Sequence, residues 1–250
     1  LRRSNGRQNQ TQNRQRHTTQ TPRCGRNSYE QLMESQKIIT NIRSIHAQFP
    51  VPGNLRRHLL NVASVGALVA DHWIGPAINK TDLVAYLLLH DLGNLVKMHV
   101  PSASLLDPND TVRVDYWLQQ QEETWKTYGK DDYKATLAMV AQLGIAPRVL
   151  QLIIDSDWHE MPRVAIGNDW EQKIGKYADY RVGPRGILTL HERIEELRIR
   201  YKGRLTPEEE SKISTFETAV HTIGAHVRKN MRITEEDIND DTVAAYRKKF

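Results

Sequence analysis

The chain has 250 residues, of which 39% are apolar and 26% charged, an ordinary composition for a soluble globular protein with a substantial core. A single cysteine, Cys24, excludes an intrachain disulfide framework and favours a reducing compartment. The longest central apolar run, residues 83–89, is far shorter than the ~20 residues of a membrane span, and no leader pattern opens the chain. We therefore expect a cytoplasmic protein without a membrane segment.

The formal net charge of +5 originates at one end of the chain. Residues 1–27 hold seven of the 35 Lys and Arg residues and no acid, which leaves 28 basic and 30 acidic residues in 28–250. We expect 1–27 to be a disordered basic tail, because so few apolar side chains cannot offset the entropy of ordering. Such a tail can bind RNA or acidic partners, but no aromatic residue interleaves the arginines. The near-neutral remainder argues against a nucleic-acid partner.

From residue 28 onward the hydrophobic pattern is helical. After Pro52 and Gly53, one face of a predicted helix carries His58, Val62, Val65, Val69 and His72. Further predicted starts are Asn79, before a helix that runs into His90 and Asp91, then Asp110, Asp131 (for a helix ending near Gly144) and Pro147.

The C-terminal third adds helix-start signatures and no strand signal. Residues 170–181 are typical of a helix. Thr189 with Glu192 and Thr206 with Glu209 match the capping box, and Thr234 with Asp237 is a weaker version. No alternating apolar run bounded by turn residues predicts a strand. The expected fold class is all-α.

The densest apolar segment runs directly into a histidine and an aspartate, in Asp82-Leu-Val-Ala-Tyr-Leu-Leu-Leu-His90-Asp91-Leu-Gly-Asn94. A buried aspartate must be paired, hydrogen-bonded or bound to a metal. For this dipeptide alone, a buried His–Asp pair is the simpler interpretation. His58, on a core-facing stripe, and Asp179, in a later apolar helix, favour a metal instead. Two imidazole nitrogens and two carboxylates suit Mn²⁺, Fe²⁺, Mg²⁺, Co²⁺ or Ni²⁺.

The order His58…His90-Asp91…Asp179 resembles the HD superfamily of metal-dependent phosphohydrolases. In that family the first histidine opens a His-x-x-x-Val-Ala pattern, as His58 does here, and the last aspartate comes from a distant helix. The resemblance covers roughly residues 50–185. It implies a multi-helix HD domain over 28–186, with helices in 187–250 packing on the same domain. It also implies one divalent metal ion, held by His58, His90, Asp91 and Asp179.

Two positions depart from the family pattern. Asn94 stands where many members have lysine, with Lys97 one turn further on. Tyr133 lies in a stretch where binuclear members would add a histidine. We therefore expect a mononuclear site. His159 is one further candidate for a ligand or proton donor.

The resemblance implies hydrolysis of a phosphomonoester or phosphodiester, with a nucleotide as the favoured small-molecule substrate. A bound divalent ion activates water, while cations must hold the remaining phosphate oxygens. The predicted substrate-binding residues are Arg57, Lys97 and Arg181, and the predicted catalytic residues are Asp91, Asp132 and Arg181. For each charged residue outside the ligand set, the alternative is that its side chain lies at the surface in contact with solvent. The departures at Asn94 and Tyr133 also leave open a catalytically inactive, metal-holding regulatory or binding domain.

Overall fold

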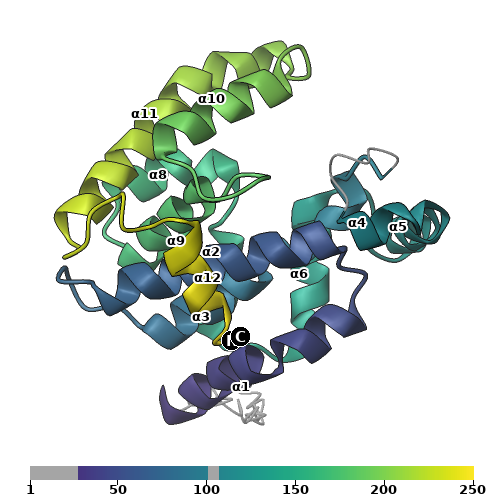
Figure 1. Ribbon diagram of the computed structural model, residues 1–250, viewed down its shortest axis with the longest axis horizontal. Helices are drawn as coiled ribbons and strands as arrows, with labels where there is room; N and C mark the ends of the chain where they lie inside the picture. The colour runs from purple at the N-terminus through teal and green to yellow at the C-terminus, as the bar shows by residue number, and fades with distance from the viewer. Residues whose placement is uncertain (1–27, 101–106) are drawn as a thin grey trace, which may run out of the picture.

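The computed structural model describes residues 28–100 and 107–250, and it confirms the all-α fold class (Figure 1). The predicted tail, residues 1–27, lies outside the described residues. Within the described part of the chain no strand forms, and only two isolated β-bridges occur, Trp73 with Met231 and Val182 with Ile187. The first helices are α1 (Ser28–Gln48), α2 (Gly53–Asp71), α3 (Lys80–Leu89), the 3-10 helix η1 (Asn94–Lys97), α4 (Pro108–Thr111), α5 (Val114–Tyr128) and α6 (Asp132–Val140).

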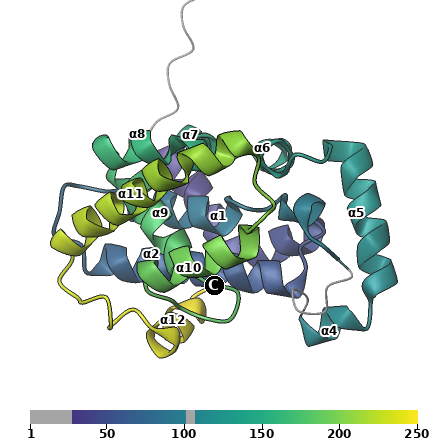
Figure 2. The same ribbon diagram turned by 90° about the horizontal axis from the view of Figure 1, so that it is seen from above.

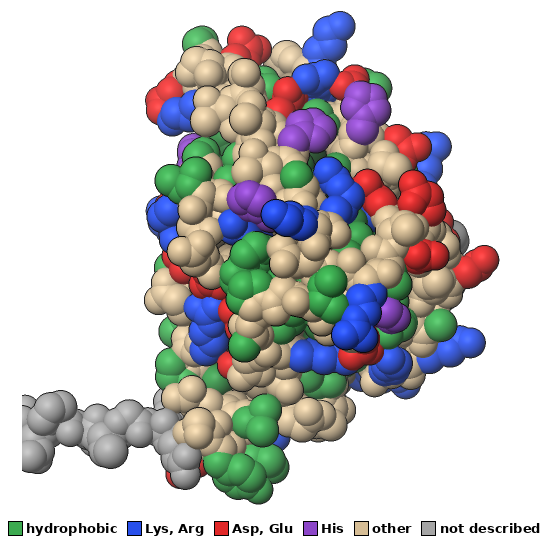
Figure 3. Space-filling view, turned by 90° about the vertical axis from the view of Figure 1, so that its left-hand side faces the viewer, with side chains coloured by type: hydrophobic (Ala, Val, Ile, Leu, Met, Phe, Trp, Pro, Cys, Tyr) green, Lys and Arg blue, Asp and Glu red, His purple; other side chains and the backbone are tan. Residues whose placement is uncertain are grey.

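The remaining helices complete the chain order. They are η2 (Ala141–Leu143), α7 (Pro147–Ile154), η3 (Trp158–Glu160), α8 (Met161–Ile166), α9 (Trp170–Arg181), α10 (Leu190–Tyr201), α11 (Pro207–Lys229) and α12 (Asp240–Arg247). None of the helices in the described residues is long and apolar enough to cross a membrane. On the face in Figure 3, Lys and Arg side chains are interspersed with Asp and Glu.

Helix α3 is the centre of the fold because it is apolar on every side. All of its residues from Asp82 to Leu89 are buried, as expected for a helix enclosed by other elements. Asn79 caps it as predicted, with its side chain accepting from the backbone N–H groups of Thr81 and Asp82. Helices α1, α2, α7 and α9 surround α3, and its C-terminal end therefore reaches the interior of the protein.

Two glycines let the neighbouring helices approach α3 closely. A Cβ atom at Gly66 of α2 would overlap the Leu87 side chain, and one at Gly175 of α9 would overlap the Tyr86 ring. Since close-packed interiors tolerate little extra volume, both positions require glycine for this spacing. The faces of α2 and α9 that carry polar residues thus lie within side-chain reach of the end of α3.

The C-terminal helices pack on this core. Helix α12 covers α2, while α11 lies across α8 and α9 (Figure 2). The predicted capping boxes at Thr189 and Thr206 are confirmed at the starts of α10 and α11. One buried hydrophobic cluster extends from Ile38 of α1 to Val243 of α12. The chain end returns to α1, where Arg43 donates to the Phe250 carbonyl at 3.2 Å.

Two predicted helix starts are wrong. Asp110 does not cap a helix: Asp107 caps α4, and the Asp110 carboxylate accepts a hydrogen bond from the Gly53 amide at the start of α2. Thr234 and Asp237 do bond to each other, but in a turn, and α12 begins after Asn239. Both differences arise because short polar side chains satisfy whichever free amide lies nearest in space.

A buried histidine ties α1 to the end of α3. His46 is 2% exposed, and its Nε2 lies 3.3 Å from the Leu88 carbonyl oxygen, to which the neutral ring donates. Burial lowers the pKa of His46 to about 4, although the bond to Leu88 opposes this change. The folded state therefore favours the neutral ring, whereas the unfolded chain protonates near pH 6.5.

We predict that acid destabilises the fold through His46. The contribution of the neutral ring is complete above pH 6.5 and is lost progressively as the pH falls to about 4, by ~3 kcal/mol in total. Urea titrations at a series of pH values measure this, and His46→Gln, which keeps a donor for Leu88, should remove that part of the acid dependence. Identical pH profiles for the two proteins would contradict the prediction.

Candidate metal centre

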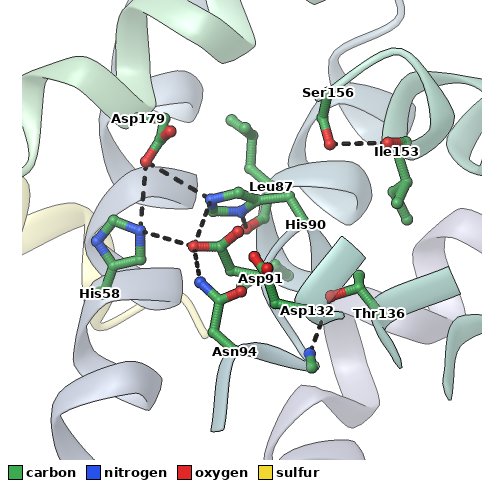
Figure 4. Close-up of polar contacts among 12 residues, drawn as sticks. His58, Leu87, His90, Asp91, Asn94, Asp132, Thr136, Ile153, Ser156 and Asp179 are labelled. Carbon is green, nitrogen blue, oxygen red and sulfur yellow. Dashed lines mark hydrogen bonds and ion pairs between the residues drawn. The ribbon is translucent and has the colours of Figure 1, made fainter. Parts of the chain in front are cut away.

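Three helices bring the predicted ligands to one place (Figure 4). His58 lies on α2, His90 is the C-cap residue of α3 and is followed by Asp91, and Asp179 lies near the end of α9. Ligand atoms of His58, His90 and Asp179 all lie within 4.8 Å of one another. Donor atoms at such separations can coordinate a single metal ion after small side-chain rotations bring them to metal–ligand distances.

The imidazole nitrogens and carboxylate oxygens face each other. Asp179 Oδ1 lies 3.3 Å from His58 Nε2 and 3.6 Å from His90 Nε2. Asp91 Oδ2 lies 3.7 Å and 3.8 Å from the same two nitrogens. The structure thus brings together all four residues that the sequence singled out. Asp91 stands at the edge of the tighter group formed by the other three.

His90 is oriented as a metal-binding histidine would be. Its Nδ1 lies 2.9 Å from the Leu87 carbonyl oxygen, so this nitrogen carries the proton and Nε2 presents a lone pair. The side chain is 5% exposed, and Nε2 is buried without a hydrogen-bond partner. Leaving such an atom unsatisfied costs about 1–3 kcal/mol. A divalent cation among these donors would satisfy it, and so the residues fit a metal.

The pKa values of the cluster reflect the opposite charges that it brings together. Although burial alone would lower it, the charges of Asp91 and Asp179 raise the pKa of His90 to about 9. Burial alone would raise the pKa of Asp179, but the two imidazoles hold it well below its usual range. The cluster therefore favours positive charge at its centre, which is the electrostatic requirement for holding a cation.

Asn94, which departs from the family pattern, supports Asp91. Its side-chain amide donates to Asp91 Oδ2, the oxygen that faces both imidazoles. This bond orients the carboxylate within the group, as outer hydrogen bonds do around metal ligands. The adjacent Gly93 also holds the doublet in place, because a Cβ there would lie 2.5 Å from the backbone nitrogen of Thr136.

Lys97 and Asp132 form an ion pair beside the doublet. Lys97 Nζ lies 2.6 Å from Asp132 Oδ2, and the lysine side chain is 48% exposed. Although burial alone would lower it, the charges of Asp91 and Asp132 raise the pKa of Lys97. Lys97 therefore keeps its charge near the centre, where it is available to an anion arriving from solvent.

Lys176 was missed by the sequence reasoning. It is buried on α9, one turn before Asp179, and its ammonium group donates to the backbone carbonyls of Ser156 and Asp157. Burial lowers its pKa to about 8, against the opposing charge of Asp179. The i, i+3 spacing between Lys176 and Asp179 indicates that both residues lie on the same face of the helix. The spacing does not show whether the lysine is buried or exposed.

Arg57 faces away from the centre. As the neighbour of His58 on α2, it points to another side of the helix, where it pairs with Asp107 at 3.0 Å. It lines a surface pocket of about 410 Å³ that contains none of the four candidate ligands. In this conformation it does not supply the predicted substrate contact.

The expected phosphate contact of Arg181 must be corrected. Its side chain is 3% exposed and turns toward the C-terminal segment. The guanidinium donates to the carbonyls of Leu188, Glu235 and Ile238 and to the Tyr177 hydroxyl. Helix α9 does end at Arg181, as expected, but the freed side chain closes the loop to α10 instead of reaching the metal centre. Arg181 is a structural residue.

His159 and Tyr133 do not join the four candidate ligands. His159 is exposed and stacks on Trp158, with ring centroids 3.8 Å apart. The Tyr133 hydroxyl donates to the Ile154 carbonyl at 2.8 Å. Within the described residues, the set on α2, α3 and α9 is the one group of three or more histidine, cysteine or acidic side chains whose ligand atoms lie close enough to share a metal ion.

Comparisons with protein-family models, with curated proteins and with solved structures found no match for this chain. The resemblance to the HD superfamily therefore rests on the order of four residues in the sequence. Membership of that family stays a prediction.

We predict that one Mn²⁺ binds per chain and that alanine at His58, His90 or Asp179 abolishes this binding. Because the metal must displace the His90 proton, its affinity should rise about tenfold per pH unit from pH 6.5 to 8. Metal analysis and calorimetry at several pH values measure both effects. His159→Ala is the matched control and should bind Mn²⁺ like the parent. Full Mn²⁺ binding by two of the three ligand variants would refute the site.

We further predict that Arg181→Ala destabilises the fold and leaves the metal centre intact. The change strands three backbone carbonyls and opens a cavity, at a cost of about 3–5 kcal/mol of unfolding free energy. Chemical denaturation measures the loss, and metal analysis of the folded protein should still find one Mn²⁺ per chain. A stable variant with impaired metal binding would show that Arg181 acts at the centre after all.

Proposed function

We propose that this protein is a metal-dependent phosphohydrolase that holds one divalent cation with His58, His90, Asp91 and Asp179. The observation that carries the proposal is the buried, unbonded Nε2 of His90, which faces two carboxylates. Nitrogen and oxygen donors in equal number suit Mn²⁺, Fe²⁺, Co²⁺, Ni²⁺ or Mg²⁺. When bound, such an ion lowers the pKa of a water molecule and polarises a phosphoryl oxygen.

The surrounding residues support hydrolysis rather than metal storage. Lys97 supplies a positive charge beside Asp91 for the oxygens of an anionic substrate. Asp132, its partner, provides a carboxylate that can accept a proton from the attacking water and pass it on. Asn94 and the Leu87 carbonyl keep two ligands in position without movement during the reaction. Lys97 and Asp132 are paired with each other, and Asn94 and the Leu87 carbonyl bond directly to Asp91 and His90.

The substrate class is taken from the sequence resemblance. We propose a small phosphomonoester or phosphodiester, with a nucleotide favoured, in a reducing compartment such as the cytoplasm. The mixture of acidic and basic side chains on the face in Figure 3 does not favour a polynucleotide as the partner. The alternative function is a metal-holding regulatory domain without catalytic turnover. A measurement of hydrolytic activity distinguishes this alternative from a phosphohydrolase.

We predict metal-dependent hydrolysis in a panel of phosphomonoesters and phosphodiesters tested with each of the five metals. Asp132→Asn should keep the metal and lower kcat/KM by about 10²- to 10⁴-fold, the range for loss of a general base. The adjacent Asp131→Asn is the matched control: Asp131 caps α6 by accepting from the Lys134 amide, and asparagine caps equally well. Full activity of Asp132→Asn would exclude the carboxylate as base. A metal-loaded protein inactive on the whole panel would favour the regulatory reading.

A further inference from the structure

The surface pocket beside Arg57 lies on the face of α2 opposite to His58. Gly53, Arg56, Arg57 and Leu60 line it from α2, at the i, i+3, i+4 and i+7 spacing of one helix face. His58 lies roughly 150° around the helix axis from the centre of this face, because each residue turns the helix by about 100°. The pocket and the metal centre are therefore separate sites built on the same helix.

Segments distant in sequence complete this pocket. Asp107, Asn109 and Asp110 line it at the start of α2, and Arg247 reaches it from α12, which packs across α2 (Figure 1). The volume of about 410 Å³ lies within the range of roughly 300–1,000 Å³ that is typical of small-molecule sites. The pocket can therefore hold a small molecule and not only a single ion.

Two of the three arginines in the pocket have no acidic partner among the described residues. Arg56 Nη2 makes a long contact of 3.4 Å with the Val51 carbonyl, and Arg247 Nη1 donates to Asn61 Oδ1 at 2.8 Å. Since a guanidinium carries five N–H donors, each of these arginines keeps several donors for other acceptors. Each also keeps a positive charge that no carboxylate in the described part of the chain neutralises.

The two aspartates of the pocket are bound at helix starts instead. The buried Asp110 carboxylate accepts from the Gly53 amide at the start of α2. Asp107 accepts from the Asn109 amide at 3.2 Å, at the start of α4, and pairs with Arg57 at 3.0 Å. The unbalanced positive charge of the pocket therefore belongs to Arg56 and Arg247.

This set of donors favours a ligand that carries a diphosphate group. The planar fork of a guanidinium matches the spacing of phosphate oxygens, and each such contact is a charge-assisted hydrogen bond. Arg56 and Arg247 come from different helices, so two linked phosphate groups can each meet one of them. Leu60 adds an apolar surface for the remainder of the ligand.

We propose that this pocket is a second ligand site, which binds the diphosphate group of a small molecule through Arg56 and Arg247. None of the four candidate metal ligands lines it, so the inference goes beyond the proposed function and does not depend on it. Arg57, which the sequence assigned to the substrate, contributes a third positive charge here. A ligand bound to both helices should also stabilise the packing of α12 on α2.

The test measures binding of inorganic pyrophosphate to the full chain by calorimetry. We expect a Kd below about 1 mM for the parent. Arg56→Gln and Arg247→Gln should each raise it about tenfold, and the double variant about 100-fold, because charge-assisted hydrogen bonds are lost. Arg198→Gln is the matched control, since the carboxylates of Glu195 and Glu217 already pair with that arginine. His58→Ala, which removes a candidate metal ligand, should leave the Kd unchanged.

Several outcomes would overturn the proposal. A parent that does not bind pyrophosphate at 1 mM, or a double variant with the parental Kd, excludes the site. Loss of binding in His58→Ala together with normal binding in the double variant would place pyrophosphate at the metal centre. Citrate, an anion of similar charge, should bind more weakly, and equal affinity would contradict selection of a diphosphate. If Arg247→Gln fails to fold, an unchanged Kd in Arg56→Gln refutes the proposal.

Discussion

The Nε2 atom of His90 lies buried where α2, α3 and α9 meet, and no hydrogen bond satisfies it. Its other ring nitrogen is held by the Leu87 carbonyl, so the ring cannot turn to relieve the deficit without breaking that bond. Two carboxylates and the His58 imidazole face the same point. A cation bound among these donors would satisfy this nitrogen and the facing carboxylates together.

The helices can deliver these side chains only because their backbones come close together. Gly66 and Gly175 allow α2 and α9 to pack against α3, and Gly93 allows the turn after the doublet to lie against α6. The candidate ligands sit one on each helix, with Asp91 just beyond the end of α3. The same packing that buries the apolar residues of α3 therefore sets the separations within the metal centre, so its geometry depends on the core.

Structural features that depend on interactions between residues close in sequence could be predicted from the sequence. Helix starts at Asn79, Asp131, Thr189 and Thr206 were predictable because a capping side chain bonds to an amide two or three residues away. The burial of α3 followed from its unbroken apolar run. Asp110 was assigned wrongly because its partner, the Gly53 amide, is distant in sequence and near only in the fold.

The sequence by itself determined the all-α class and the four residues that meet at the centre, since a histidine and an aspartate at the end of a buried helix require partners. Only the tertiary structure decided which charges surround them. Arg181, two residues from Asp179, turns away to bind carbonyls, while Lys97, one turn after the doublet, pairs with Asp132. The direction of a long side chain depends on the acceptors within its reach, and those are fixed by packing between distant segments.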